Sequence, residues 1–167
     1  MADAMAGTDA LVTTVPGIVL TVMVADCVPL VLFDPVARVL ACVHAGWGGT
    51  VRGVTPAALA AMRSLGSDPA SVIAGIGPAI HPDRYQVGAD VVEMAEATFG
   101  DRCKKVVRPD GTGKWTFDLW RGNMIQLADG ASRTTRYTSR HWVPASARAS
   151  SATSPRVRAG GSPRWRG

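Results

Sequence analysis

Two side chains that could bind a metal ion or carry out nucleophilic chemistry, Cys27 and His44, flank two apolar runs. Cys27 comes directly before residues 28–33, and His44 comes directly after residues 39–43. Asp34-Pro35 separates the runs and favours a turn, so the pattern predicts two adjacent strands. A thiol and an imidazole at strand ends could form a metal site, a nucleophile with its base, or part of an ordinary core.

The carboxylate of Asp26, beside Cys27, bears on this choice. A neighbouring negative charge raises the pKa of a thiol, so a free thiolate is less natural at Cys27 than one bound to a metal. The spacing of Cys27 and His44 matches no standard zinc motif, so the core interpretation stays open. Asp26 itself is either a partner that orients a metal ligand or a turn residue.

Further strands and helices are predicted on both sides of this pair from apolar periodicity and turn residues. The predicted strands cover residues 9–13, 17–24, 71–76, 106–108 and 114–117, and the predicted helices cover residues 55–65, 89–99 and 119–128. Thr55 is the predicted cap of the first helix, with Pro56 as its first residue. Because strands and helices do not alternate strictly, the predicted class is α+β or a mixed α/β sandwich.

Length and composition indicate one globular domain in a reducing compartment. A chain of 167 residues with 47% hydrophobic content can bury a core. No apolar run reaches the roughly 18 residues that span a bilayer, and the start lacks a basic signal-peptide region. Three Cys do not make a disulfide framework. We therefore expect a cytoplasmic protein that contacts no membrane.

The net charge of +5 belongs to the end of the chain. Residues 1–130 hold ten Lys and Arg against thirteen Asp and Glu, whereas residues 131–167 hold eight Arg and no Lys, Asp or Glu. The second segment also lacks Leu, Ile, Phe and Met, so we predict a domain over residues 1–130 and a disordered tail over residues 131–167. Trp142 and Trp165 among the arginines would suit RNA, but a nucleic-acid partner is not our expectation.

Four motifs in the same order resemble those of a known family. They are Ala-Asp-Cys-x-Pro at residues 25–29, His-Ala-Gly-Trp-x-Gly-Thr at residues 44–50, Gly-Pro-x-Ile with Tyr-x-Val-Gly at residues 77–88, and an Asp-Leu helix start at residues 118–119. The chain is similar in these motifs to the YfiH-type proteins, which are labelled polyphenol oxidoreductases, laccase-domain proteins or purine nucleoside phosphorylases. The resemblance implies mixed β-sheets in a layered sandwich flanked by helices.

The resemblance also implies an activity and a site. It implies phosphorolysis of adenosine and inosine at a zinc ion, or a copper ion, with methylthioadenosine cleavage and adenosine deamination as related activities. Cys27 and His44 match two of the family's three metal ligands. Gly46, Trp47 and Gly49 would contact the substrate. The family's Arg is replaced by Gly48, and Arg52 is our expected substitute.

The resemblance does not extend to the family's two ends. The segment that carries the third metal-ligand His in the family has no counterpart here, and the family's Cys-Thr and Gly-Arg motifs are absent after Gly130. We therefore hypothesise a frameshift near Gly130 and an impaired site. His81 is a candidate replacement ligand, Cys42 shares a predicted strand face with His44, and Cys103 is expected at the surface.

Three alternatives to a zinc nucleoside phosphorylase remain open. The first is an inactive fragment without enzymatic function. The second is a copper polyphenol oxidoreductase. The sequence does not favour it, because a multicopper centre needs many imidazoles and the whole chain has three His. The third is a cysteine hydrolase with Cys27 as nucleophile and His44 as base. The oligomeric state is not predicted.

Overall fold

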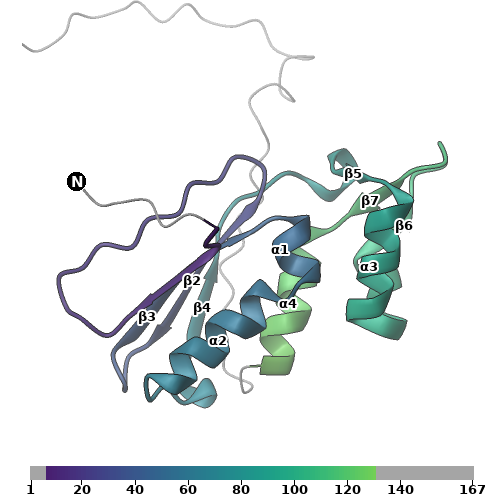
Figure 1. The fold of residues 1–167 in the computed structure, drawn as a ribbon. Coiled ribbons are helices and arrows are strands. Elements are labelled where there is room, and N and C mark those ends of the chain that lie inside the picture. The colour runs from purple at the N-terminus through teal and green to yellow at the C-terminus, as the bar shows by residue number, and fades with distance from the viewer. Residues whose placement is uncertain (1–6, 131–167) are drawn as a thin grey trace, which may run out of the picture.

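The computed structural model describes residues 7–130, and its largest element is a four-stranded antiparallel sheet (Figure 1). The strands are β1 (Ala10–Thr13), β2 (Val28–Asp34), β3 (Val39–Ala45) and β4 (Ile73–Ile76), in the order β1-β3-β2-β4. β2 and β3 pair along their whole length, from Val28 opposite Ala45 to Asp34 opposite Val39. The predicted strand pair is therefore confirmed as a hairpin.

One face of this sheet forms the core. Along β2 the side chains alternate between the two faces, as the pleat of a strand requires, and every second one is fully buried. Helix α2 (Val54–Ser64) packs on β3, and α4 (Leu119–Gly130) packs on α2 (Figure 1). The buried residues of β2 and β3 are Val28, Leu30, Leu32, Asp34, Val39, Ala41, Val43 and Ala45.

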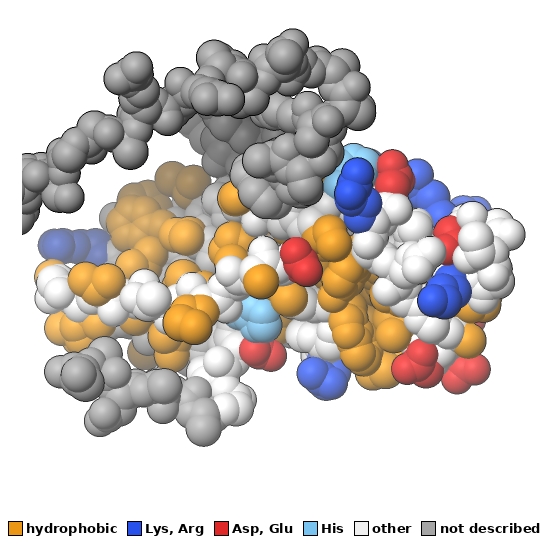
Figure 2. All heavy atoms as spheres, turned by 90° about the horizontal axis from the view of Figure 1, so that it is seen from above, with side chains coloured by type: hydrophobic (Ala, Val, Ile, Leu, Met, Phe, Trp, Pro, Cys, Tyr) orange, Lys and Arg blue, Asp and Glu red, His pale blue; other side chains and the backbone are white. Residues whose placement is uncertain are grey.

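The opposite face of the sheet is apolar and open to solvent over β2 and β4. Val31, Phe33 and Ile73 on this face are 47%, 40% and 43% exposed. In Figure 2 most charged side chains lie on the half of the molecule that carries α3, whereas the half with the sheet shows mainly hydrophobic and uncharged atoms. We call Val31, Phe33 and Ile73 the open sheet face.

A second, smaller antiparallel sheet lies beside the helices. Its strands are β5 (Gln86–Val87), β6 (Val107–Pro109) and β7 (Trp115–Phe117), in the order β5-β7-β6, and it is accompanied by α3 (Ala89–Phe99) and the 3-10 segment Gly100–Lys105. The short helix α1 (Trp47–Val51) contacts β3, α2, α3 and α4 and so joins the two halves (Figure 1). The predicted α+β class with layered sheets and helices is confirmed.

Two local predictions are wrong, and one falls outside the described chain. No strand forms over residues 17–24, because this extended segment pairs with no strand of the described part. Thr55 does not cap α2: the helix begins at Val54 after Gly53, whose φ of 79° suits glycine. The tail over residues 131–167 lies outside the described residues. Within residues 7–130, no helix has the length and apolar character needed to cross a bilayer.

The turn between β2 and β3 is organised by the buried carboxylate of Asp34. Its Oδ1 accepts hydrogen bonds from the backbone N–H groups of Val36 and Ala37, at 2.8 and 3.0 Å. Its Oδ2 accepts from the Ser67 hydroxyl at 2.7 Å and from the Asp68 backbone N–H at 3.0 Å. Burial alone would raise the pKa of Asp34, but these four hydrogen bonds outweigh it and hold the pKa below its ordinary value.

Replacing Asp34 by alanine is expected to lower the free energy of unfolding by about 2–3 kcal/mol at pH 7, because four donors lose their acceptor. Since the pKa is lower in the folded chain, the stabilisation is complete above the unfolded pKa and disappears as the pH falls through the folded pKa. Urea unfolding of both proteins between pH 7 and pH 3 measures this. A stability gap that stays constant over that range would contradict the assignment, and the exposed Glu93→Ala change serves as control.

Candidate active site

Cys27 and Gly46 face each other just beyond the paired ends of β2 and β3. The last pair of the ladder is Val28 with Ala45, so the next residue on each strand lies at the same edge. A β-carbon built on Gly46 would lie only 2.9 Å from Cys27 Sγ. The thiol therefore rests on the bare α-carbon of Gly46, so any side chain at this position would have to displace it.

His44, the last but one residue of β3, is held by Asp9 from the segment that leads into β1. The His44 backbone N–H donates to the Asp9 carbonyl at 2.8 Å, and His44 Nδ1 lies 2.9 Å from Asp9 Oδ1. Both side chains are partly exposed, at 32% for His44 and 46% for Asp9. The imidazole is thus fixed at one ring nitrogen, at an edge that solvent can reach.

The environment of Cys27 disfavours a free thiolate. Burial raises the pKa of the Cys27 thiol, and the negative charges of Asp26 and Asp9 raise it further. An isolated nucleophilic cysteine needs a lowered pKa, usually from a nearby cation or helix terminus. A bound divalent cation would reverse the electrostatics, because a thiol that coordinates a metal is deprotonated.

The predicted Gly-rich loop folds into α1, which begins directly after Gly46. Trp47 is partly buried against the core and Tyr85 lies nearby. Burial raises the pKa of the Tyr85 hydroxyl and the charge of Cys27 raises it further, whereas a hydrogen bond with the Trp47 backbone acts in the opposite direction. Trp47 and Tyr85 therefore come from separate segments and meet near Cys27.

Arg52 lies over Gly48. A β-carbon on Gly48 would be 2.9 Å from Arg52 Nη2 and 3.4 Å from Cζ, so the guanidinium occupies the space that a side chain at position 48 would enter. The two residues are four apart on the first turns after Gly46, which places them on one face. That Arg52 substitutes for an arginine at position 48 stays a prediction.

The other predicted candidates make contacts of their own, although the charge of Asp26 reaches Cys27. Asp26 is exposed, and its backbone carbonyl accepts from Ile80 N–H at 3.0 Å. His81 Nδ1 caps a 3-10 turn, at 3.4 Å from the Asp83 N–H. Cys42 shares the face of His44, and burial raises the pKa of its thiol. Cys103 is buried, which corrects its predicted surface position.

The donors near Cys27 suit zinc but are few. A thiolate and an imidazole are standard zinc donors, and the carboxylate on the far nitrogen of His44 is the usual companion of a metal-bound histidine. Within the part of the chain that the structure describes, no group of three or more His, Cys, Asp or Glu side chains could hold a metal ion. Cys27 and His44 could therefore supply two of the donors that a zinc ion needs.

Asp9 was missed by sequence reasoning. Its carboxylate stands in the unremarkable stretch Gly-Thr-Asp-Ala, and no motif marks it. Its role depends on register: Ala10 pairs with Val43, which places Asp9 directly opposite His44. A sequence argument could have found it only by aligning the first predicted strand antiparallel to the strand before His44.

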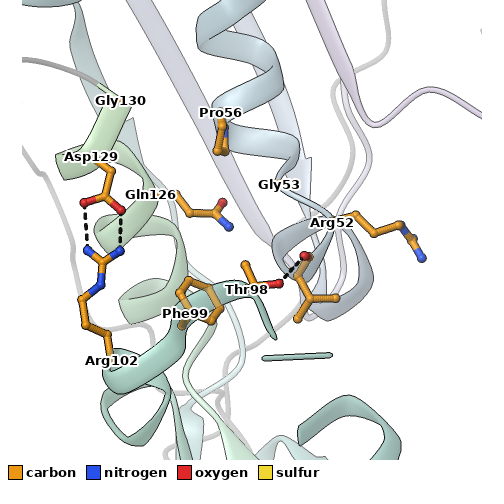
Figure 3. Close-up of a pocket in the computed structure, with 10 residues that line it drawn as sticks. Arg52, Gly53, Pro56, Thr98, Phe99, Arg102, Gln126, Asp129 and Gly130 are labelled. Carbon is orange, nitrogen blue, oxygen red and sulfur yellow. Dashed lines mark hydrogen bonds and ion pairs between the residues drawn. The ribbon is translucent and has the colours of Figure 1, made fainter. Parts of the chain in front are cut away.

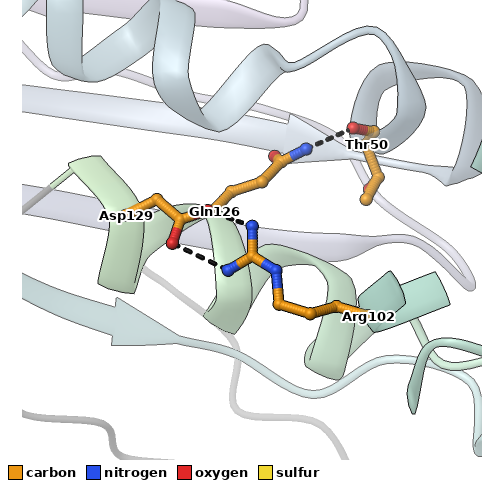
Figure 4. Close-up of polar contacts among 4 residues, drawn as sticks. All are labelled: Thr50, Arg102, Gln126 and Asp129. Atoms are coloured by element: carbon orange, nitrogen blue, oxygen red, sulfur yellow. Dashed lines mark hydrogen bonds and ion pairs between the residues drawn. The ribbon is translucent and has the colours of Figure 1, made fainter. Parts of the chain in front are cut away.

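A pocket of about 380 Å³ lies elsewhere, where the end of α1 meets α2, α3 and α4 (Figure 3). Thr98 Oγ1 donates to the Val51 carbonyl at 2.7 Å, and the buried Gln126 Nε2 donates to the Thr50 carbonyl at 2.7 Å. Arg102 and Asp129 form a bidentate ion pair beside them (Figure 4). Figure 3 shows Arg52 pointing away from this pocket, and neither Cys27 nor His44 lines it. Its polar groups mainly close the carboxyl end of α1.

Replacing Gly46 by alanine tests the contact with the thiol. The new β-carbon would displace Cys27 Sγ, and because this atom ends a short rotatable side chain, the fold should tolerate the change. We expect zinc affinity to fall about 10-fold, which is the size of loss commonly seen when a residue that supports a metal ligand is replaced. Gly75→Ala is the control, since its β-carbon would lie 3.8 Å from the nearest atom. Equal zinc affinities in the two variants, measured by chelator competition, would contradict the prediction.

Comparison with known proteins identifies the family. The family model described as multi-copper polyphenol oxidoreductase laccase matches residues 1–145. The chain belongs to this family. Among solved structures, the YfiH protein of Bacillus licheniformis is similar with a TM-score of 0.75 and 31% identity, over 80% of this chain and 51% of that one. YlmD of Geobacillus stearothermophilus gives 0.72 and 29%, over 81% and 51%.

Curated relatives of this chain carry the names purine nucleoside phosphorylase and adenosine deaminase. A purine nucleoside phosphorylase of Streptomyces coelicolor is 52% identical over 97 residues, which are 56% of this chain and 40% of that protein. Adenosine deaminase RL5, from an unknown prokaryotic organism, is 39% identical over 139 residues, or 83% and 53%. The chain thus spans about half the length of the curated relatives it matches.

Proposed function

We propose that this chain supplies two ligands, Cys27 and His44, of a zinc site in a purine nucleoside phosphorylase that acts on adenosine and inosine. The observation that carries the proposal is the pairing of a thiol of raised pKa with an imidazole held at Nδ1 by a carboxylate. This is the donor arrangement of a metal site rather than of a free cysteine nucleophile. The names of curated relatives supply the substrate class.

Zinc would supply Lewis acidity toward a phosphate or water oxygen. The chain's own groups would bind and orient the substrates. Arg52, which lies over Gly48, would bind the phosphate anion through its guanidinium. The backbone N–H groups of the loop from Gly46 to Gly49 would help to hold the phosphate, and Trp47 would form an apolar wall for the purine base. The related activities, methylthioadenosine cleavage and adenosine deamination, would use the same site.

The histidine content of the chain fits the hypothesis of a multicopper oxidase poorly. A laccase centre needs several imidazoles brought together, but this chain contains three His in all. Of these, His44 and His81 are described and lie in different clusters. We therefore keep zinc as the proposed metal. A single copper ion, bound by the same thiolate and imidazole, is the alternative.

A cysteine hydrolase is the second candidate, and one observation favours it. Asp9, His44 and Cys27 are the residue types of a catalytic triad: Asp9 would orient the imidazole, His44 would be the base and Cys27 the nucleophile. The raised pKa of Cys27 opposes this function, because the base and its surroundings should stabilise the thiolate. Chelation separates the two candidates, since a thiol hydrolase does not need zinc.

The test is a product assay with the purified chain, zinc, inosine and inorganic phosphate. We expect phosphate-dependent release of hypoxanthine that stops on chelation and in the Cys27→Ser variant. Arg52→Ala should raise the KM for phosphate, whereas Arg63→Ala, on the exposed face of α2, should not. Release that survives chelation but is lost on alkylation of Cys27 would establish the hydrolase instead. No turnover in the zinc-loaded chain would support the inactive fragment and overturn the proposal.

A further inference from the structure

The position of Asp9 is set by the sheet and not by the site. Its neighbour Ala10 pairs with Val43 in the ladder between β1 and β3, so Asp9 and His44 form the next antiparallel pair. The backbone bond from His44 N–H to the Asp9 carbonyl, 2.8 Å long, continues the ladder. Directly opposed residues project to the same face, which brings the carboxylate onto the imidazole.

The contact between the side chains decides which ring nitrogen carries the proton. An ionised carboxylate can only accept hydrogen bonds, so a neutral imidazole next to it must place its proton on Nδ1. Nδ1 of His44 lies 2.9 Å from Asp9 Oδ1, within hydrogen-bond distance. The lone pair of Nε2 is then available to a ligand.

The Gly-rich loop packs against the same carboxylate. A β-carbon on Gly49 would lie 3.6 Å from Asp9 Oδ2 and 3.5 Å from the His44 carbonyl oxygen, which are ordinary contacts. Asp9 therefore lies between the end of β3 and the start of α1, with its side chain still 46% exposed. Asp26 offers a comparison: its charge also reaches Cys27, but Asp9 in addition contacts the imidazole of His44.

We propose that Asp9 is a positioning residue that holds His44 in the Nδ1–H tautomer and directs Nε2 toward a metal ion bound beside Cys27. This inference rests on the proposed function for the metal, but the tautomer can be measured without it. Asp9 does not touch the substrate. It acts through His44, as the carboxylate partners of metal-bound histidines generally do.

The experiment compares the wild type with Asp9→Asn and Asp26→Asn. Both variants remove one negative charge near Cys27, but only the first changes the partner of His44 Nδ1, from a carboxylate that can only accept to an amide that can either accept or donate. Nitrogen-15 NMR of the metal-free proteins reports the tautomer, with the His44 signals assigned by means of His44→Gln and His81→Gln. We expect Nδ1–H in the wild type and in Asp26→Asn, and a mixture of tautomers in Asp9→Asn.

Zinc affinity by chelator competition is the second readout. Zinc affinity should fall about 10- to 100-fold in Asp9→Asn. In Asp26→Asn it should fall by less than about 3-fold, because the lost charge is at an exposed carboxylate that does not hold the imidazole. If Asp9→Asn does not fold, Asp9→Glu, which keeps the charge but displaces the carboxylate, is measured instead and should lose affinity.

The two proposals fail in different ways. An unchanged His44 tautomer and unchanged zinc affinity in a folded Asp9 variant would overturn the role of Asp9. A wild-type chain in the Nδ1–H tautomer that binds no zinc would overturn the proposed metal site while leaving Asp9 as the residue that fixes the imidazole.

Discussion

Replacing Cys27 by serine is expected to lower zinc affinity by more than about 100-fold, which exceeds the usual effect of residues that only support a metal ligand. The thiolate carries the negative charge that attracts the ion, and a serine hydroxyl does not ionise readily enough to replace it. Chelator competition on both proteins measures the change. The bound metal should also disappear from Cys27→Ser after dialysis against a weak chelator.

Cys42→Ser is the matched control for this experiment. Cys42 stands on the same sheet and, like Cys27, is partly buried with a pKa raised mainly by burial. It lies two residues before His44 on β3. We expect its replacement to leave zinc affinity within about 3-fold of the wild type, the range of small surface effects. Equal losses in both variants would place the metal between the two cysteines and not at the strand ends.

Replacing Asn123 by alanine is expected to lower the free energy of unfolding by about 3–4 kcal/mol, through lost hydrogen bonds and a cavity. Asn123 is fully buried on α4. Its Oδ1 accepts from Thr55 Oγ1 at 2.7 Å, and its Nδ2 donates to Thr50 Oγ1 at 3.0 Å and to the Leu119 carbonyl at 2.9 Å. The residue thereby ties α1 and α2 to α4.

Chemical denaturation of Asn123→Ala and of Arg121→Ala, an exposed change on the same helix, would measure this difference. Because α1 begins at the candidate site, Asn123→Ala should also weaken zinc binding more than Arg121→Ala does. A loss of stability below about 1 kcal/mol, the value of a single ordinary hydrogen bond, would show that the network is not what joins these helices.

The hairpin of β2 and β3 was predictable because its evidence is local. Two β-branched runs and an Asp-Pro turn define it. The Asp34 side chain accepts hydrogen bonds from backbone N–H groups of the turn, as aspartate at the start of a turn commonly does. Helix α3 was predicted with the bounds Ala89–Phe99, since its apolar spacing and the following Gly100 are also local signals. Cys27 and His44 were chosen by residue type, and the pairing of β2 with β3 brings them to one edge.

What the sequence did not predict depends on contacts between distant segments. Residues 17–24 have strand-like composition, but a strand requires a partner, and the described chain provides none. Thr55 resembles a helix cap, yet its hydroxyl donates to Asn123 inside the core. Asp9 gained its role only from strand register. Local propensity therefore located the helices and strands. Pairing between distant segments decided where these elements end and placed Asp9 beside His44.

The open sheet face has a practical consequence for anyone who purifies this chain. Dyes such as ANS brighten on apolar surface, and a bright signal is commonly taken to mean a loosened, molten core. Val31, Phe33 and Ile73 remain exposed in the intact fold. The native chain should therefore bind the dye while its near-ultraviolet circular dichroism stays intact, so that discarding dye-bright fractions would discard the folded protein.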